Sequence, residues 1–211
     1  MTTVSAAQLP SLYEGLGIDL NGLGVVMLSL EPGQSLVDEK LGLSADDLYT
    51  SKHPNRKYLT GEPIVHASHT TLLYGLLPGI NAADVQDVMH GWEPPLAVLI
   101  DSYELFPAQL PESDPDYDQY AVLVGRIQLL NSPEVLEAHQ RLSLLPHIDT
   151  YPEYKPHVTL AYVKKEAAPQ WLWIAEARDI MLSVDTSKDA RGLLGVTADE
   201  KAARASQTEQ R

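Results

Sequence analysis

Two short sequence motifs, called words below, each place a histidine two residues before a threonine and three before a leucine. They read HTTL, beginning at His69, and HVTL, beginning at His157, and each is followed by more apolar residues. Side chains two apart on a β-strand point to the same face, so we expect Thr71 beside His69 and Thr159 beside His157. Thr70, Val158 and the two leucines would then point into the core.

Two imidazoles and two hydroxyls suit the cleavage of a phosphodiester. The attacking oxygen must lose a proton and the leaving oxygen must gain one, on opposite sides of phosphorus. Histidine can do either near neutral pH, because its reference pKa is about 6.5. Threonine hydroxyls can donate to the non-bridging oxygens, where charge develops. The pattern predicts His69, Thr71, His157 and Thr159 as catalytic residues, with no metal and no cofactor.

Composition sets the class of protein. The chain has 211 residues, of which 44% are hydrophobic, enough to build a core. A net charge of −14 argues against non-specific binding to duplex nucleic acid, which relies on a basic surface. The apolar runs are far shorter than the roughly 20 residues of a membrane span. The absence of cysteine removes disulfides and thiolate metal sites, and the first residues lack a secretory signal. We therefore expect a cytoplasmic protein with no membrane partner.

Hydrophobic patterning and turn signals predict an α+β domain with mainly antiparallel sheet, because strand, helix and strand occur in two similar rounds. An asparagine and a serine–proline pair mark the starts of two helices. We expect an N-terminal lead-in over 1–20, one domain over 21–185 whose lobes meet near the acidic loop 110–118, and a flexible tail over 186–211. The predicted strands are 24–30, 64–77, 96–103, 120–130, 157–163 and 180–184, and the predicted helices are 81–91, 132–142 and 170–177.

The paired H-x-T words resemble the 2H phosphoesterase superfamily over roughly residues 20–185. That group includes RNA 2′,3′-cyclic phosphodiesterases once called 2′–5′ RNA ligases, and phage enzymes that destroy cyclic oligonucleotide immune signals. The resemblance implies two pseudo-symmetric lobes around a central cleft. It also implies that His69 and His157 are the acid–base pair and that Thr71 and Thr159 bind the phosphate. HTTLLYGL is similar to the first motif of the phage anti-CBASS enzymes, which act in the host cytoplasm.

The substrate implied is a small nucleotide or a cyclic oligonucleotide. Tyr151 and Tyr154 lie in an irregular loop just before the second word and are predicted to stack on bases, while Lys155 is predicted to meet a phosphate. His66, at the entrance of the first strand, is predicted to contact the substrate. Other aromatic residues that could stack on a base are Tyr103, Tyr162, Trp92, Trp171 and Trp173.

Several alternatives stay open at this point. His66-Ala67-Ser68 also fits H-x-[S/T], although a polar residue follows where the other words have leucine. A metal site using His66, His69 and His157 is disfavoured, because residues three apart on a strand point to opposite faces. A non-catalytic protein that sequesters a nucleotide would carry the same four residues. The linkage is also open between a 2′,3′-cyclic phosphate, a 2′–5′ bond and a 3′–5′ cyclic dinucleotide, and the oligomeric state is not readable from the sequence.

Overall fold

The computed structural model describes residues 23–31, 41–42, 46–51, 68–108, 110–149, 153–176, 180–187, 189, 191 and 193–196. These residues form one antiparallel sheet of seven strands and three helices. The predicted fold class, α+β with mainly antiparallel sheet and flanking helices, is confirmed. The elements are β1 (Gly24–Ser29), β2 (His69–Leu76), α3 (Ala82–Val88), β3 (Ala97–Pro107), β4 (Tyr120–Ile127), α4 (Pro133–Leu142), β5 (His157–Lys164), α5 (Ala168–Glu176), β6 (Ile180–Ser183) and β7 (Leu193–Val196).

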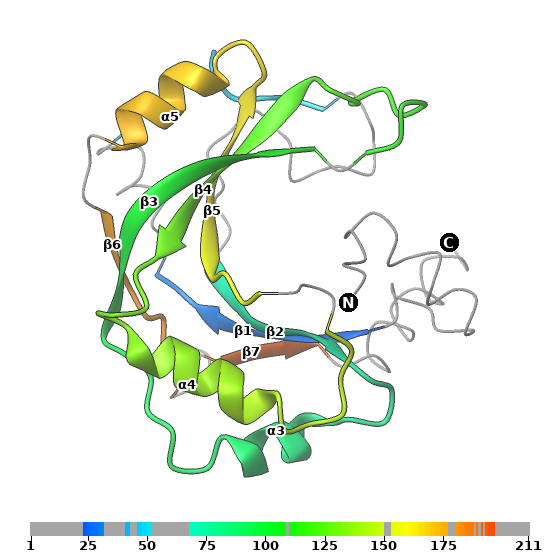
Figure 1. Cartoon of the computed structure of the whole chain (residues 1–211), viewed down its shortest axis with the longest axis vertical. Helices are drawn as coiled ribbons and strands as arrows, with labels where there is room; N and C mark the ends of the chain where they lie inside the picture. Colours follow the sequence, from blue (N-terminus) through cyan, green and yellow to red (C-terminus); the bar gives the residue numbers. More distant parts are fainter. Residues whose placement is uncertain are drawn as a thin grey trace.

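The sheet has two halves that meet where β2 lies beside β5. The strand order is β6-β3-β4-β5 in one half and β2-β1-β7 in the other. Figure 1 shows the sheet curling, with α5 beside the upper half and α3 and α4 beside the lower half. Because β2 and β5 both begin at the seam and run in opposite directions, the first residues of both strands lie at the centre of the sheet.

Each half also receives a short segment that precedes the motif strand of the other half. Leu48, upstream of β2, bridges to Val163 on β5. His147, upstream of β5, bridges to Leu76 on β2. A third bridge joins Leu30 at the end of β1 to Val184 at the end of β6. Each lobe is therefore completed by a segment that precedes the motif strand of the other lobe, so the two lobes are built alike.

The core lies on the side of the sheet that carries the helices. Leu72 and Leu160, the leucines of the two words, are 0% and 2% exposed, as the alternation predicted. Leu142 of α4 is equally buried, and α4 packs against β2. Each such side chain contributes about 1.5–3 kcal/mol to folding. The leucines therefore anchor both motif strands with one face inward and the histidine face outward.

The helix starts were predicted well, but one cap differs. Asn81 caps α3 in a full capping box: its side chain accepts from Ala83 and Asp84, and the Asp84 carboxylate accepts from its backbone. Ser132 precedes α4 with Pro133 at the first turn, yet its side chain makes no capping bond. It is fully buried, so the proline alone marks this start in the sequence.

The predicted flexible tail over 186–211 is wrong in part, because β7 lies within it. Leu193 pairs with Leu28 and Leu194 with Met27, so β7 extends the sheet beyond β1. Pairing with β1 at the edge of the sheet stabilises β7 through backbone hydrogen bonds, which the polar composition of this segment does not reveal. The lead-in over 1–20 and residues 197–211 lie outside the described residues, and the domain limits remain a prediction.

Candidate active site

The two H-x-T words meet on one face of the sheet. Thr70 pairs with Val158 across β2 and β5, and both side chains are buried. In an antiparallel pair the neighbours on either side must also be opposite, so His69 faces Thr159 and Thr71 faces His157. These four side chains point away from the buried face. The four groups therefore lie around the Thr70–Val158 pair, two on each strand.

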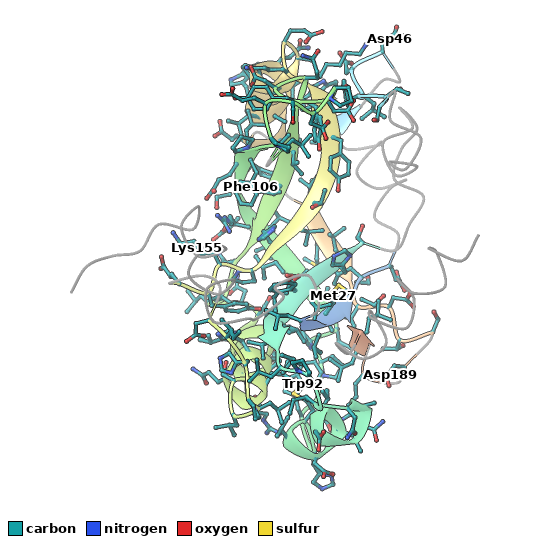
Figure 2. All side chains as sticks on the ribbon, turned by 90° about the vertical axis from the view of Figure 1, so that its right-hand side faces the viewer. Met27, Asp46, Trp92, Phe106, Lys155 and Asp189 are labelled. Atoms are coloured by element: carbon teal, nitrogen blue, oxygen red, sulfur yellow. The ribbon has the colours of Figure 1, made fainter. Side chains whose placement is uncertain are left out.

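Burial differs among the four residues in a way that fits an accessible site. His69 is exposed, while Thr71, His157 and Thr159 are half-buried. Ser29 and Met27 of β1 pair with His69 and Thr71 and continue the same face toward β7. Figure 2 labels Phe106 of β3 above Lys155 and Met27 of β1 below it, so the sheet continues on both sides of this region.

The imidazole of His157 is held in a defined orientation. Its Nδ1 lies 3.0 Å from the backbone carbonyl oxygen of Lys155. A carbonyl oxygen only accepts, so Nδ1 carries hydrogen and Nε2 is left to exchange a proton. The ring also meets the edge of Phe106, with centroids 5.1 Å apart at 69°.

A cationic pair of side chains lies beside His157. Arg126 of β4 is opposite His157 in the strand register and holds Glu104 through two hydrogen bonds of 3.0 and 2.8 Å. The bond from Arg126 is the main cause that lowers the pKa of Glu104, and the charges of Arg126, Lys155 and His157 act in the same direction. Lys155 is exposed and forms an ion pair of 3.0 Å with Glu153. The sequence did not single out Arg126 or Glu104, because their place beside His157 depends on which strands become neighbours.

Tyr154 connects the loop before the second word to the first word. Its hydroxyl donates to the backbone carbonyl of Thr71 at 3.1 Å, and its ring stacks on His139 with centroids 3.8 Å apart. His139 of α4 in turn places Nδ1 2.8 Å from the Leu72 carbonyl, so this nitrogen donates. Burial raises the pKa of Tyr154, which keeps the phenol protonated as a donor. A base cannot stack on the ring face that His139 covers, so the predicted stacking role can use only the opposite face.

The remaining sequence predictions have mixed outcomes. His66 and Tyr151 lie outside the described residues, so their substrate contacts and the alternative register stay predictions. Tyr162 is half-buried on β5, and Trp173 of α5 is 71% exposed. The other aromatic residues proposed for stacking belong to the core, because they are buried: Tyr103, Trp92 and Trp171.

Among the residues that the structure describes, no group of three or more His, Cys, Asp or Glu side chains could hold a metal ion. Within that same part of the chain, no helix is long and apolar enough to cross a membrane.

Comparison with known proteins gives distant structural likeness alone. No family model matches the chain, and no curated protein matches it. Among solved structures, Usb1 of Kluyveromyces marxianus with uridine monophosphate is similar at 9% identity and a TM-score of 0.40, over 84% of this chain and 92% of that one. A second structure of Kluyveromyces marxianus Usb1 is similar at 10% identity and a TM-score of 0.40, over 83% and 91% of the two chains.

Proposed function

We propose that this protein is a metal-independent phosphodiesterase that cleaves a nucleotide phosphodiester by acid–base catalysis with His69 and His157. The observation that carries the proposal is the Thr70–Val158 pair, which puts both H-x-T words on one face of the sheet. Two chance histidines on separate strands have no reason to lie diagonally across one strand pair, each with the same threonine spacing. A resemblance to the 2H phosphoesterases supports the same activity.

The reaction needs two proton transfers and one displacement at phosphorus. One imidazole takes the proton from the attacking hydroxyl, whose oxygen forms a bond to phosphorus. The bond to the leaving oxygen breaks, and the other imidazole gives that oxygen a proton. When water then opens a 2′,3′-cyclic intermediate, the two histidines exchange roles. His157 suits either role because its Nδ1 is already committed to the Lys155 carbonyl.

The threonines would stabilise the charge that develops on the non-bridging oxygens. Thr71 and Thr159 lie on the same face as the histidines and on opposite strands, so their hydroxyls can approach one phosphate from two sides. The Tyr154 hydroxyl holds the Thr71 carbonyl and so fixes the backbone from which one donor projects. Lys155, exposed beside the site, adds positive charge for an anionic substrate.

The substrate class we propose is a small nucleotide with a ribose phosphodiester, including cyclic oligonucleotide signals such as those destroyed by anti-CBASS enzymes. Three linkages suit the four side chains: a 2′,3′-cyclic phosphate, a 2′–5′ bond and a 3′–5′ cyclic dinucleotide. In the last two, a neighbouring ribose hydroxyl or water supplies the attacking oxygen. We propose neither duplex nucleic acid nor a membrane as a partner.

A substrate panel in EDTA tests this proposal. The purified chain is incubated with a 2′,3′-cyclic mononucleotide, a 2′–5′ dinucleotide, and 3′–5′ cyclic di- and trinucleotides, and products are resolved by chromatography. We expect turnover of at least one, lost in His69→Ala and His157→Ala and kept in His90→Ala, which changes an exposed histidine near α3. Tight binding without turnover of any would replace catalysis by sequestration.

A further inference from the structure

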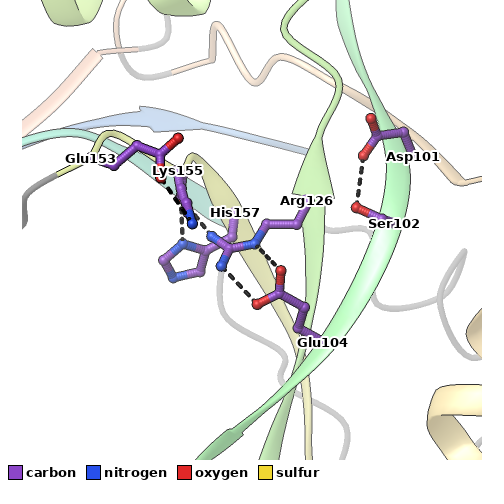
Figure 3. Close-up of polar contacts among 7 residues, drawn as sticks. All are labelled: Asp101, Ser102, Glu104, Arg126, Glu153, Lys155 and His157. Carbon is purple, nitrogen blue, oxygen red and sulfur yellow. Dashed lines mark hydrogen bonds and ion pairs between the residues drawn. The ribbon is translucent and has the colours of Figure 1, made fainter.

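Arg126 shares a hydrogen-bond acceptor with His157. Its guanidinium donates to the Lys155 carbonyl at 2.9 Å, and the same carbonyl oxygen accepts from Nδ1 of His157 at 3.0 Å. One carbonyl oxygen has two lone pairs, so both bonds can exist together. Figure 3 shows Arg126 between Glu104 and the segment that leads into His157, with dashed contacts to both.

The guanidinium itself is fixed on the sheet. Glu104 of β3 takes two of its hydrogen bonds in a fork, and the guanidinium lies 5.1 Å from the Phe106 ring centre. A forked pair fixes orientation as well as position, which a single ammonium contact does not. The Arg126 side chain is 15% exposed, so packing also limits its freedom.

The same Phe106 ring contacts the His157 imidazole. Arg126 and Phe106 therefore reach His157 by two routes: one through the Lys155 carbonyl, and one through the aromatic edge. Lys155 itself lies in the irregular segment just before β5, where nothing in regular strand geometry sets the direction of its carbonyl. The carbonyl needs a second donor to stay aimed at Nδ1.

We propose that Arg126, clamped by Glu104, is a positioning residue that holds the Lys155 carbonyl against His157 and so keeps His157 in its Nδ1–H tautomer. Without it the carbonyl can turn away, and Nδ1 no longer competes for the proton. The Nε2 atom would then carry hydrogen in part of the molecules and could not act as base. The kinetic part of this inference rests on the proposed function, whereas the tautomer does not.

The first measurement follows the His157 ring by long-range ¹H–¹⁵N correlation at a pH where the ring is neutral. We expect one Nδ1–H tautomer in the parent protein, and a mixture in Arg126→Met, which keeps the long stem without donors. Lys155→Ala keeps the carbonyl and should keep the parent tautomer. His69 serves as an internal reference in every spectrum. A parent ring in the Nε2–H form, or an unchanged ring in Arg126→Met, overturns the proposal.

The second measurement separates positioning from direct contact with substrate. On the best substrate of the panel, Arg126→Met should lower kcat on the order of 10- to 100-fold with KM within a few-fold, as for other groups that orient a reacting side chain. Arg126→Lys keeps the charge but not the fork, and should recover little of the loss. A full recovery by lysine would mean that charge alone matters and would refute positioning.

Glu104→Ala should change the kinetic constants differently if Arg126 positions the carbonyl than if Arg126 binds the phosphate. If Arg126 positions the carbonyl, losing its clamp lowers kcat. If Arg126 binds the phosphate, releasing it from Glu104 lowers KM and leaves kcat at or above the parent, which would overturn the inference. Thermal unfolding identifies a variant that fails to fold, and Arg126→Lys, the milder change, then carries the tautomer test. No turnover with any substrate, together with a shifted tautomer in Arg126→Met, would refute the proposed function and keep this inference.

Discussion

Thr70 of β2 and Val158 of β5 lie directly opposite each other at the centre of the sheet, and both are fully buried. This pair sets the register of the whole site, because the residues on either side of it are the two histidines and two threonines. A slip of either motif strand by one residue would turn its histidine and its threonine toward the core. The buried leucines that follow each word make that slip costly.

The histidines should act as a unit. His69→Ala and His157→Ala should each lower kcat by about 10²-fold or more, the usual contribution of one general acid or base. The double variant should lose much less than the product of the two, since either loss already disables the proton exchange. Single-turnover rates on the best substrate provide the measurement. If His66→Ala inactivates and His69→Ala does not, the register of the first word is wrong.

Turnover should not depend on a metal. No described group of side chains could hold one, and the proposed steps use protons and hydroxyls alone. We expect the initial rate to be unchanged in excess EDTA and after exhaustive dialysis, with elemental analysis of the same sample. A loss in chelator that zinc or manganese restores would assign the chemistry to a bound ion instead.

Local sequence predicted the elements that carry the site but not their neighbours. β5 begins at His157 as predicted, and Asn81 caps α3 as expected, because alternation and capping act within a few residues. β2 begins at His69, inside the predicted strand 64–77. The contacts of His157 with Arg126 and Phe106 depend on β3, β4 and β5 lying side by side. Strand order is a property of the packed sheet, so single-strand patterns cannot reveal it.

Two differences between the predicted and the observed strands have specific causes. The polar composition of residues 186–211 predicts a tail and hides β7, because four residues with two leucines are too short a pattern against polar flanks. β3 runs to Pro107 and not to 103, since Glu104 breaks the apolar run. That glutamate is tolerated in the strand because it points to the open face, where Arg126 holds it. The polar residue that interrupts the apolar run is therefore the one that holds Arg126 beside His157.

Gly75 should be the least replaceable glycine of the motif strands. Its φ is +109°, and a Cβ there would lie 2.2 Å from the backbone oxygen of Ile148. Gly75→Ala should lower the free energy of unfolding by about 2–4 kcal/mol, from backbone strain plus the clash. Gly79→Ala is a matched control, because φ is +91° and nothing lies within 4 Å. Urea unfolding should show the smaller loss for Gly79→Ala, and equal losses would mean that the approach of Ile148 is relaxed at little cost.

Glu104 should make stability depend on acidic pH. Its pKa is lowered from 4.5, first by the hydrogen bond from Arg126, so the folded protein holds this proton less tightly than the unfolded chain. The stabilisation is therefore complete above pH 4.5 and is lost as pH falls through the lower pKa of the folded state. The stability difference between the parent and Glu104→Gln should be constant above pH 4.5 and shrink below it. Since the side chain is 48% exposed, the difference should be small and weaker in high salt. A difference that persists unchanged in acid would show that the charge of Glu104 is not what stabilises the pair.

The threonines separate catalysis from simple binding. Thr71 and Thr159 face the two histidines across the strand pair, where their hydroxyls can donate to non-bridging oxygens that carry more charge in the transition state than in the ground state. Removing such a donor lowers kcat and changes KM little. Thr→Val is the fair substitution, since it keeps the β-branched shape and the strand preference. Each should cost on the order of 1.5–3 kcal/mol, or roughly 10- to 150-fold in kcat.

Thr→Ser at the same positions provides the matched control. It restores the hydroxyl while giving up the methyl group that orders the side chain, so it should recover much of the lost rate. A protein that only sequesters its ligand would show no turnover, and Thr→Val would then appear solely as weaker binding in calorimetry. If Thr71→Val and Thr159→Val both keep kcat within about twofold of the parent, neither hydroxyl stabilises developing charge. The histidines would then act without the threonine donors, and the third position of each word would serve packing alone.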